Sequence, residues 1–461
     1  MTRARTGFGE RIDAASSVIL ACVALACAAL AAFVVIERVT FLTGLKETLF
    51  FLCLPLVVGA GALVATRLAV ERKLKLLVLL LSTGVSLLAA ELYLVALESY
   101  RVSVEAREMA EAADEARRAW KDYDERSTRQ FFADHWSQGT KVYPRIYQLS
   151  SRTVTVDGAR VFPTSNLSNQ LIVECFADGR YKVYLSDEYG FANPHGLHGR
   201  DAELVVVGDS FSAGECVSAE DDVAAVLRES HPATVNLGIG GAGPLWELAN
   251  LVEYGLPLHP KTVFWLYYEG NDLSDLMYEA RFPELTRYLV REDAQLRPNK
   301  ALVDARVAAL QTSEIESLKE IKPTAPTRES ALGGLLRTLK LSNLRRKLHM
   351  SRDASREEQL SIDTLEQVIV RAKTLVERRG GRFVLVYVPD YSRFAGGSVA
   401  FDRERVLEVL ARNGVRVLDL LPALVAHPDV LSLYPHRRMG HFNAAGYEFI
   451  AQQLLAELPR D

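Results

Sequence analysis

Apolar and charged residues are unevenly distributed along this 461-residue chain. Residues 14–36 and 48–66 are uncharged runs, and residues 76–97 form a third run that is interrupted only by Glu91. A helix rises 1.5 Å per residue, so about 20 apolar residues cross a hydrocarbon core of ~30 Å. The pattern therefore predicts a membrane region at 1–97 with three transmembrane helices.

Basic residues near these runs predict their orientation. The N-terminal tail carries three arginines, the first loop has one Arg and one Lys, and the second loop has four basic residues. Because Lys and Arg accumulate on the cytoplasmic side, we expect the tail and the second loop inside. Three spans then place everything after residue 97 outside a cytoplasmic (inner) membrane, in an extracytoplasmic or periplasmic location. In this orientation Glu91 lies near the outer interface and reaches water, although an intramembrane carboxylate is also a candidate functional residue.

Two regions of different composition lie between the spans and the main domain. Residues 98–152 begin with a charged stretch that has no Gly or Pro up to residue 132, which predicts a stalk or linker helix. An amphipathic helix packed on the domain fits this stretch equally well. Residues 153–199 alternate with a period of two around Asp-Gly turns, which predicts a small β element.

From residue 200 to 461, apolar strands alternate with helical patterns. Strands are expected at 203–207, 233–238, 261–268, 382–388 and 415–420, and helices at 357–379, 402–412 and 443–458. Near-continuous apolar strands separated by helices predict an α/β domain with a parallel sheet covered on both faces. Ligands of such sheets bind at the carboxyl ends of the strands. Residues 279–356 interrupt the alternation. We expect a lid there, with a membrane-surface helix as the alternative.

Composition narrows the range of partners. The net charge of −4 gives no basic bias toward nucleic acid. Three of the five cysteines lie in the spans, so only Cys175 and Cys216 are available for a disulfide outside the cytoplasm. No CxxC or HExxH spacing is present, and no metal is expected. The run GIGGAG at 238–243 matches a dinucleotide fingerprint, but it follows the second strand and Pro244 begins the helix, so no cofactor is expected.

The stretch VVVGDSFSAGE at 205–215 carries the candidate chemistry. Gly208 permits a tight exit from a strand, which leaves Ser210 at the strand's carboxyl end. A serine hydroxyl is a poor nucleophile until a base takes its proton, so a histidine is required. Taken alone, this serine is better explained as a helix N-cap without a chemical role.

Four blocks in order resemble the SGNH (GDSL-type) hydrolase family: GDSFSAG, NLGIGG, EGND and GHFNAAG. The resemblance covers roughly 200–278 and 357–460 and implies a three-layer α/β/α fold. It implies that Ser210 is the nucleophile and His441 the base. It also implies that the Gly241 N–H and the Asn271 side chain form the oxyanion hole, with the Ser210 N–H as a third donor. An Asx turn that caps the following helix is the alternative for Asn271.

The chain departs from the family pattern in two places. Glu269 stands where the third block usually has Gly, which adds a charge near the site. The acid usually found two or three residues before the histidine is replaced by Arg438 and Met439. His441 could be held by a backbone carbonyl or by a carboxylate from elsewhere, and Asp390 and Asp429 are the candidates.

The resemblance implies a membrane-anchored serine ester hydrolase acting outside the cytoplasm, on O-acyl (O-acetyl) groups of a glycan or a related ester. An O-acyltransferase would use the same residues, and water or a sugar hydroxyl would resolve the acyl-enzyme. The alternative from another class is a catalytically weak glycan-binding or assembly protein whose spans contact a membrane partner protein.

Overall fold

The computed structural model describes residues 2–36, 48–119, 123–148, 151–177, 180–320, 338, 341–347, 354–396, 403–437 and 440–459. Two compact units divide the chain. Met1–Asp114 and Thr324–Glu357 form the first, and Glu115–Pro323 and Glu358–Asp461 form the second. We call them the membrane unit and the catalytic unit.

The membrane unit contains three helices that are long and apolar enough to cross a membrane, at Phe8–Ile36, Thr48–Ala65 and Val70–Leu97. They belong to α1 (Thr2–Ile36), η1 with α4 (Thr48–Cys53 and Leu54–Ala65), and α5 (Val70–Ala119). Small residues let α1 and α4 approach closely, since a β-carbon at Gly59 would lie 3.0 Å from Cys27 Cβ. The predicted spans are therefore confirmed, and the third continues as helix to Ala119.

Glu91 of α5 is fully buried, which differs from the expected contact with water. Its carboxylate accepts hydrogen bonds from the backbone N–H of Asn343 at 2.9 Å and of Leu344 at 2.8 Å. Both residues belong to the short helix α14 (Ser342–Lys347), so Glu91 satisfies backbone donors at the start of that helix. Asn343 and Leu344, near the end of the predicted lid at 279–356, thus contact the third span.

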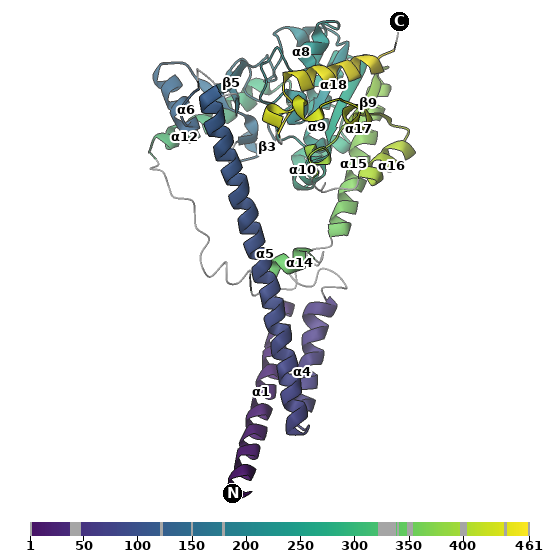
Figure 1. Ribbon diagram of the computed structural model, residues 1–461. Helices are drawn as coiled ribbons and strands as arrows, with labels where there is room; N and C mark the ends of the chain where they lie inside the picture. The colour runs from purple at the N-terminus through teal and green to yellow at the C-terminus, as the bar shows by residue number, and fades with distance from the viewer. Residues whose placement is uncertain are drawn as a thin grey trace. The chain divides into compact units, whose positions relative to one another are not determined.

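The catalytic unit is built on a five-stranded parallel sheet of order β10-β9-β8-β6-β7 (Figure 1). Its strands are β6 (Leu204–Gly208), β7 (Thr234–Asn236), β8 (Thr262–Tyr268), β9 (Arg382–Val388) and β10 (Arg416–Asp419). All five coincide with predicted strands to within two residues at each end. In sequence order the arrangement is 2-1-3-4-5, a doubly wound sheet whose switch point lies between β6 and β8.

Helices cover both faces of this sheet, which makes three layers. Alternate residues of β8 face opposite ways, because side chains alternate along a strand. Val263 and Trp265 join a core with α9 (Pro244–Asn250), α15 (Ala354–Glu377) and α16 (Arg403–Arg412). Phe264 and Leu266 join a core with α8 (Val223–Arg228), α17 (Leu421–Val425) and α18 (Ala444–Glu457). The α/β/α prediction is confirmed.

A smaller β element precedes the sheet. Strands β1 (Val142–Pro144), β4 (Leu171–Ala177) and β5 (Arg180–Leu185) form one sheet, and β2 (Val154–Val156) and β3 (Ala159–Val161) form a hairpin. The hairpin turns at Asp157 and Gly158, both with positive φ, as the Asp-Gly signal predicts. Strand β1 lies inside the region expected to be stalk.

The first half of the predicted lid supports this β element. Helix α12 (Lys300–Glu320) follows the short helices α11 (Pro283–Thr286) and η6 (Arg287–Leu289). Lys300 Nζ donates to Asn166 O at 2.8 Å, and Gln311 Nε2 donates to Pro144 O at 2.8 Å. Residues 300–320 therefore form a structural helix rather than a cover for the strand ends. Their polar composition gave no sign of this.

Candidate active site

The candidate nucleophile stands directly after the central strand β6. Gly208 has φ +155°, and a β-carbon there would lie 2.8 Å from the Leu266 carbonyl oxygen of β8. Only glycine fits this close approach. The chain then turns into the single helical turn α7 (Ser210–Ala213), which Asp209 caps by accepting the Phe211 N–H at 2.9 Å. Ser210 is thereby held at the switch point of the sheet.

The candidate base approaches from the loop before α18. His441 Nε2 lies 2.7 Å from Ser210 Oγ, a normal hydrogen-bond distance. The Asp209 carboxylate is a second acceptor for the same hydroxyl, but at 3.3 Å it is the weaker one. Asn443 secures the loop by capping α18, since its side chain accepts the Gly446 N–H at 3.0 Å. Two residues that are 231 positions apart in the chain therefore form a candidate nucleophile–base pair.

Neither carboxylate that we considered as an orienter is engaged with His441. Asp390 accepts hydrogen bonds from the Tyr268 hydroxyl at 2.8 Å and the Ser392 N–H at 2.8 Å. Asp429 is exposed and forms an ion pair with Arg437 at 2.6 Å. Arg438 and Met439 lie outside the described residues. Within the part of the chain that is described, His441 Nδ1 has no hydrogen-bond partner.

Among the described residues, Glu215 places its carboxylate close to His441. Its Oε2 lies 4.0 Å from His441 Nε2, the nitrogen that also contacts Ser210. Arg145 NH1 lies 2.5 Å from the same Oε2 and 3.7 Å from Glu174 Oε1. Arg145 comes from the segment after β1, so the small β element contributes to the surroundings of the base.

Packing also fixes the His441 ring. The Phe211 ring lies 4.9 Å from it between centroids, and Phe211 itself stacks on Tyr268 at 4.0 Å. Burial lowers the pKa of His441, the Glu215 carboxylate raises it, and Arg145 lowers it again, with burial the largest effect. A lowered pKa keeps the imidazole neutral and able to accept a proton near pH 7. Burial also raises the pKa of Asp209 to about 7.

The backbone of Gly241 has a left-handed conformation and lies very close to a neighbouring side chain. Its φ is +78°, and a β-carbon there would lie 2.1 Å from the Tyr147 ring. Among the described residues its N–H has no hydrogen-bond acceptor, whereas the N–H of neighbouring Ala242 donates to Ile239 O at 3.0 Å. An unused N–H beside the nucleophile is the kind of donor that an oxyanion hole requires.

Asn271 precedes α10 (Asp272–Glu279) at the end of β8, but its side chain does not cap that helix. Its Oδ1 is buried without a hydrogen-bond partner in the described part of the chain. The Asx-turn alternative is therefore wrong, and the amide remains available for a ligand. A buried polar group without a partner is costly and calls for an explanation.

The extra charge of Glu269 is compensated. Its carboxylate accepts hydrogen bonds from Arg393 Nε at 2.6 Å, the Tyr387 hydroxyl at 2.9 Å and the Asp390 N–H at 3.0 Å. Glu269 therefore joins β8 to the end of β9 as a structural group, and the charge that we expected near the site is neutralised.

A disulfide between Cys175 and Cys216 joins β4 to the loop that follows the nucleophile. Donor atoms of Glu215, Cys216 and His441 lie within 4.8 Å of one another. Because the Cys216 sulfur is in the disulfide, two donors remain, fewer than the three or four protein ligands of zinc sites. These residues therefore do not fit a metal centre.

Sequence reasoning missed Arg145 and Glu215. Glu215 closes the block that carries Ser210, so a charge five residues after the nucleophile was a usable signal. Arg145 had none, because it lies 65 residues earlier, in a region expected to be stalk.

Comparisons with known proteins give only distant similarity. No family model and no curated protein matches the chain. Among solved structures, the chain is similar to a protein described as lipolytic and of the G-D-S-L family from Desulfitobacterium hafniense DCB-2. The identity is 13%, the match covers 56% of this chain and 100% of that one, and the TM-score is 0.30.

Two further structures are similar at the same level. A lipase/acylhydrolase from Enterococcus faecalis is 14% identical over 56% of this chain and 99% of that one, with a TM-score of 0.28. A two-domain esterase active on acetylated mannans is 13% identical over 56% of this chain and 50% of that one, with a TM-score of 0.26. At such identities and TM-scores, the activities of these proteins are not carried over to this chain.

Proposed function

We propose that this chain is a membrane-anchored serine esterase of the SGNH type. The observation that carries the proposal is the 2.7 Å contact between Ser210 Oγ and His441 Nε2 at the switch point of a doubly wound sheet. A serine that is hydrogen-bonded to a histidine whose pKa is lowered by burial is an activated nucleophile.

The proposed reaction is a two-step acyl transfer to water. Ser210 Oγ attacks the ester carbonyl carbon while His441 Nε2 takes the hydroxyl proton. The tetrahedral intermediate collapses, the carbon–oxygen bond to the alcohol breaks, and His441 returns the proton to the alcohol oxygen. Water, deprotonated by His441, then attacks the acyl-enzyme, which releases the carboxylic acid and restores Ser210.

Three donors serve the developing oxyanion in this proposal. They are the N–H of Gly241, the side-chain amide of Asn271 and the N–H of Ser210, the first residue of α7. The Gly241 N–H has no acceptor in the described part of the chain, and Asn271 Oδ1 accepts no hydrogen bond there, so both residues are available to a substrate. Each fixed donor of this kind typically contributes ~10²–10³ in kcat.

Glu215 takes over the electrostatic role of the missing acid in this account. Its carboxylate lies 4.0 Å from Nε2 and stabilises the imidazolium that forms during each step. Arg145 holds this carboxylate in place at 2.5 Å. The arrangement differs from a usual triad, in which the acid binds Nδ1 on the opposite side of the ring.

We propose an extracytoplasmic location for the catalytic unit. An odd number of spans, the basic residues around them and the Cys175–Cys216 disulfide all support it, because disulfides persist in oxidising compartments. Alkaline phosphatase, which is active only outside the cytoplasm, fused after residue 140 should be active. This topology would be refuted if, at the same position, only a reporter that works inside the cytoplasm were active.

The substrate class that we propose is an O-acyl group of a glycan, and it rests on the family resemblance of the four sequence blocks. The activity itself is tested with a fluorophosphonate probe on the detergent-purified full chain. The wild type should form a covalent adduct on Ser210, and Ser210→Ala should form none. An unlabelled wild type would favour a binding protein without turnover.

A further inference from the structure

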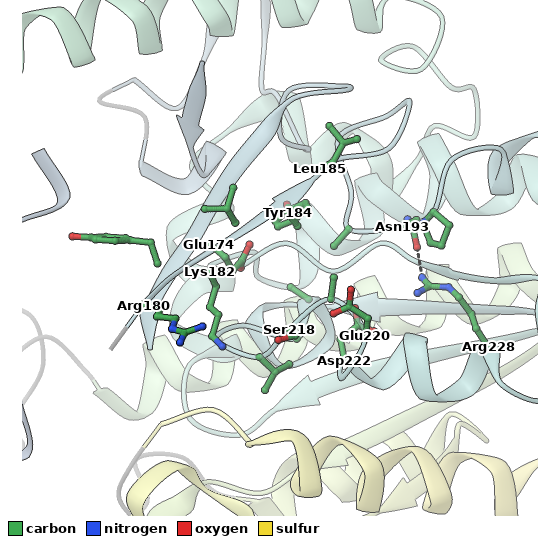
Figure 2. A pocket seen from close by; sticks show the side chains of 18 residues that line it. Glu174, Arg180, Lys182, Tyr184, Leu185, Asn193, Ser218, Glu220, Asp222 and Arg228 are labelled. Atoms are coloured by element: carbon green, nitrogen blue, oxygen red, sulfur yellow. Dashed lines mark hydrogen bonds between the residues drawn. The ribbon is translucent and has the colours of Figure 1, made fainter. Parts of the chain in front are cut away.

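Two cavities of the catalytic unit differ in whether a candidate oxyanion donor lines them. Figure 2 shows the larger one, of about 550 Å³, which is lined by Glu174 of β4 and Glu220 of the loop after the nucleophile. Neither Gly241 nor Asn271 is among its lining residues. A smaller cavity, of about 200 Å³, is lined by Gly241 together with three residues of α10. The helix that follows Asn271 therefore borders the space beside Gly241.

Glu279, the buried last residue of α10, holds the backbone that follows Gly241. Its Oε1 accepts the Gly243 N–H at 2.6 Å, and its Oε2 accepts the N–H groups of Leu245 at 3.0 Å and Trp246 at 3.2 Å. These N–H groups open α9, where they have no partner within the helix. The first of the three bonds is made two residues after Gly241, so Glu279 fixes the backbone next to this donor.

The loop at residues 238–243, which we call the glycine loop, is in close contact with α10. A β-carbon at Gly243 would lie 2.8 Å from Asp275 Cβ and 2.9 Å from Glu279 Oε2. Glycine allows such an approach because it has no β-carbon. The backbone thus comes near enough to α10 for one carboxylate to reach three N–H groups.

The other end of α10 is fixed to the central sheet. Asp272 Oδ2 accepts the N–H of Tyr268, the last residue of β8, at 2.9 Å. Asn271, the candidate side-chain donor to the oxyanion, directly precedes this helix of eight residues. Helix α10 therefore connects the Asn271 amide at its start with the backbone beside Gly241 at its end.

Resting on the esterase function proposed above, we propose that Glu279 is a positioning residue for the oxyanion hole. By holding the start of α9, it keeps the Gly241 N–H directed at the oxyanion, at the spacing from Asn271 that α10 sets. Oxyanion donors are effective when they are fixed before the charge develops. Because the N–H is needed most in the transition state, the contribution of Glu279 should appear in kcat rather than in KM.

Glu253 offers a matched control for this role. It is also buried, and its carboxylate accepts backbone N–H groups at 2.7–3.2 Å from three residues, Gln295, Leu296 and Arg297. It belongs to η4 (Leu251–Gly255), which continues α9 back toward the start of β8 and away from the carboxyl ends of the strands. Replacing Glu253 therefore removes comparable hydrogen bonds at a place remote from the glycine loop.

The test compares the wild type with Glu279→Ala, Glu279→Gln and Glu253→Ala, each as the full chain in detergent. Both alanine variants lose buried hydrogen bonds, so both should unfold at a lower temperature. In Glu279→Ala, kcat on 4-nitrophenyl acetate should also fall by about tenfold or more, up to the ~10²–10³-fold that loss of an oxyanion donor costs, with little change in KM. Glu253→Ala should keep the kcat of the wild type.

Glu279→Gln distinguishes positioning from mere filling of space. Glutamine keeps one acceptor oxygen and replaces the other with an NH₂ group, which only donates. Its kcat should therefore lie between those of the wild type and Glu279→Ala. If Glu279→Ala does not fold, Glu279→Gln decides alone: a lower kcat at unchanged KM supports the role, and the kcat of the wild type overturns it.

The other outcomes are equally decisive. Equal falls of kcat in Glu279→Ala and Glu253→Ala would overturn the positioning role, because the loss would then follow from destabilisation alone. A raised KM with unchanged kcat in Glu279→Ala would overturn it as well. A wild type that does not hydrolyse 4-nitrophenyl acetate would instead refute the esterase function itself, and the positioning role with it.

Discussion

The carboxylate of Glu215 lies 4.0 Å from His441 Nε2, and Ser210 Oγ lies 2.7 Å from that same nitrogen. Carboxylate and hydroxyl thus approach the base from one side of its ring, while Nδ1 has no partner among the described residues. Proton transfer from Ser210 creates an imidazolium, which a negative charge at this distance stabilises. This site therefore differs from a usual triad in the place of the carboxylate, which lies beside Nε2 rather than beside Nδ1.

Glu215→Gln should move the acidic limb of the pH profile of kcat/KM to lower pH. His441 acts as a base only when neutral, so activity falls as the pH falls through its pKa. Glu215 raises that pKa, and its loss leaves the Arg145 cation uncompensated, so the pKa decreases further. We expect kcat to fall by less than the ~10⁴-fold seen when an acid bound to Nδ1 is removed. Hydrolysis of 4-nitrophenyl acetate across pH measures both.

Glu174→Gln is the matched control, because Glu174 also faces Arg145, at 3.7 Å, without contributing to the pKa of His441. An acidic limb that moves equally in both variants, or in neither, would argue against the electrostatic role of Glu215.

Asn271→Ala should reduce kcat by about 10²–10³ with little change in KM, because the amide is needed only when the oxyanion forms. Its buried Oδ1 has no partner among the described residues, so the folded state should not lose a hydrogen bond. We therefore expect steady-state kinetics to show a lower kcat and thermal unfolding to show an unchanged stability. Asn299→Ala removes an exposed amide that donates to Gln295 O at 2.9 Å, so it should leave kcat unchanged. A loss of stability parallel to the loss of rate would indicate a structural role.

Gly241→Ala should lower both activity and stability. The left-handed conformation at φ +78° costs a non-glycine residue about 1–2 kcal/mol, and the new β-carbon would meet the Tyr147 ring. The double variant Gly241→Ala/Tyr147→Ala should regain the unfolding free energy that the collision removed. Its kcat should stay low as long as the backbone N–H remains displaced. A loss of stability with unchanged kcat in Gly241→Ala would contradict the oxyanion role of Gly241.

Replacing both Cys175 and Cys216 by serine should destabilise the catalytic unit. The disulfide closes a loop with a sequence separation of 41, for which chain entropy gives about 4 kcal/mol as an upper value. Denaturant unfolding of the purified chain measures the loss. Since Cys216 follows Glu215, we also expect a smaller effect on kcat. Unchanged stability under oxidising conditions would show that the disulfide does not contribute.

Local sequence patterns were sufficient for the spans, the five strands and three of the helices that cover the sheet, α15, α16 and α18. Each of these elements carries its own periodicity, and the carboxyl ends of parallel strands bring Ser210 and Asn271 to one edge. The partner of His441 could not be inferred in this way. Arg145 reaches the site through a strand paired 29 residues away in sequence, at Val142 and Leu171, and no local pattern encodes that pairing.

The segment at 279–356 was misread for a related reason. Its polar composition and the break in the strand–helix alternation predicted a lid packed over the site, but Lys300 and Gln311 place their polar ends on backbone carbonyls of the β element. Buried polar side chains that find such partners look like surface residues in the sequence. Likewise Glu91, predicted to reach water, is satisfied by backbone N–H groups more than 250 residues later.

The central claim is that Ser210 is the nucleophile of an ester hydrolase, and one comparison tests it most directly. Wild type and Ser210→Ala, purified in detergent and matched by thermal unfolding, are assayed on 4-nitrophenyl acetate. We predict that kcat/KM falls by at least ~10⁴-fold in the variant, as when the nucleophile of a serine hydrolase is removed. Equal rates for the two proteins would contradict the account.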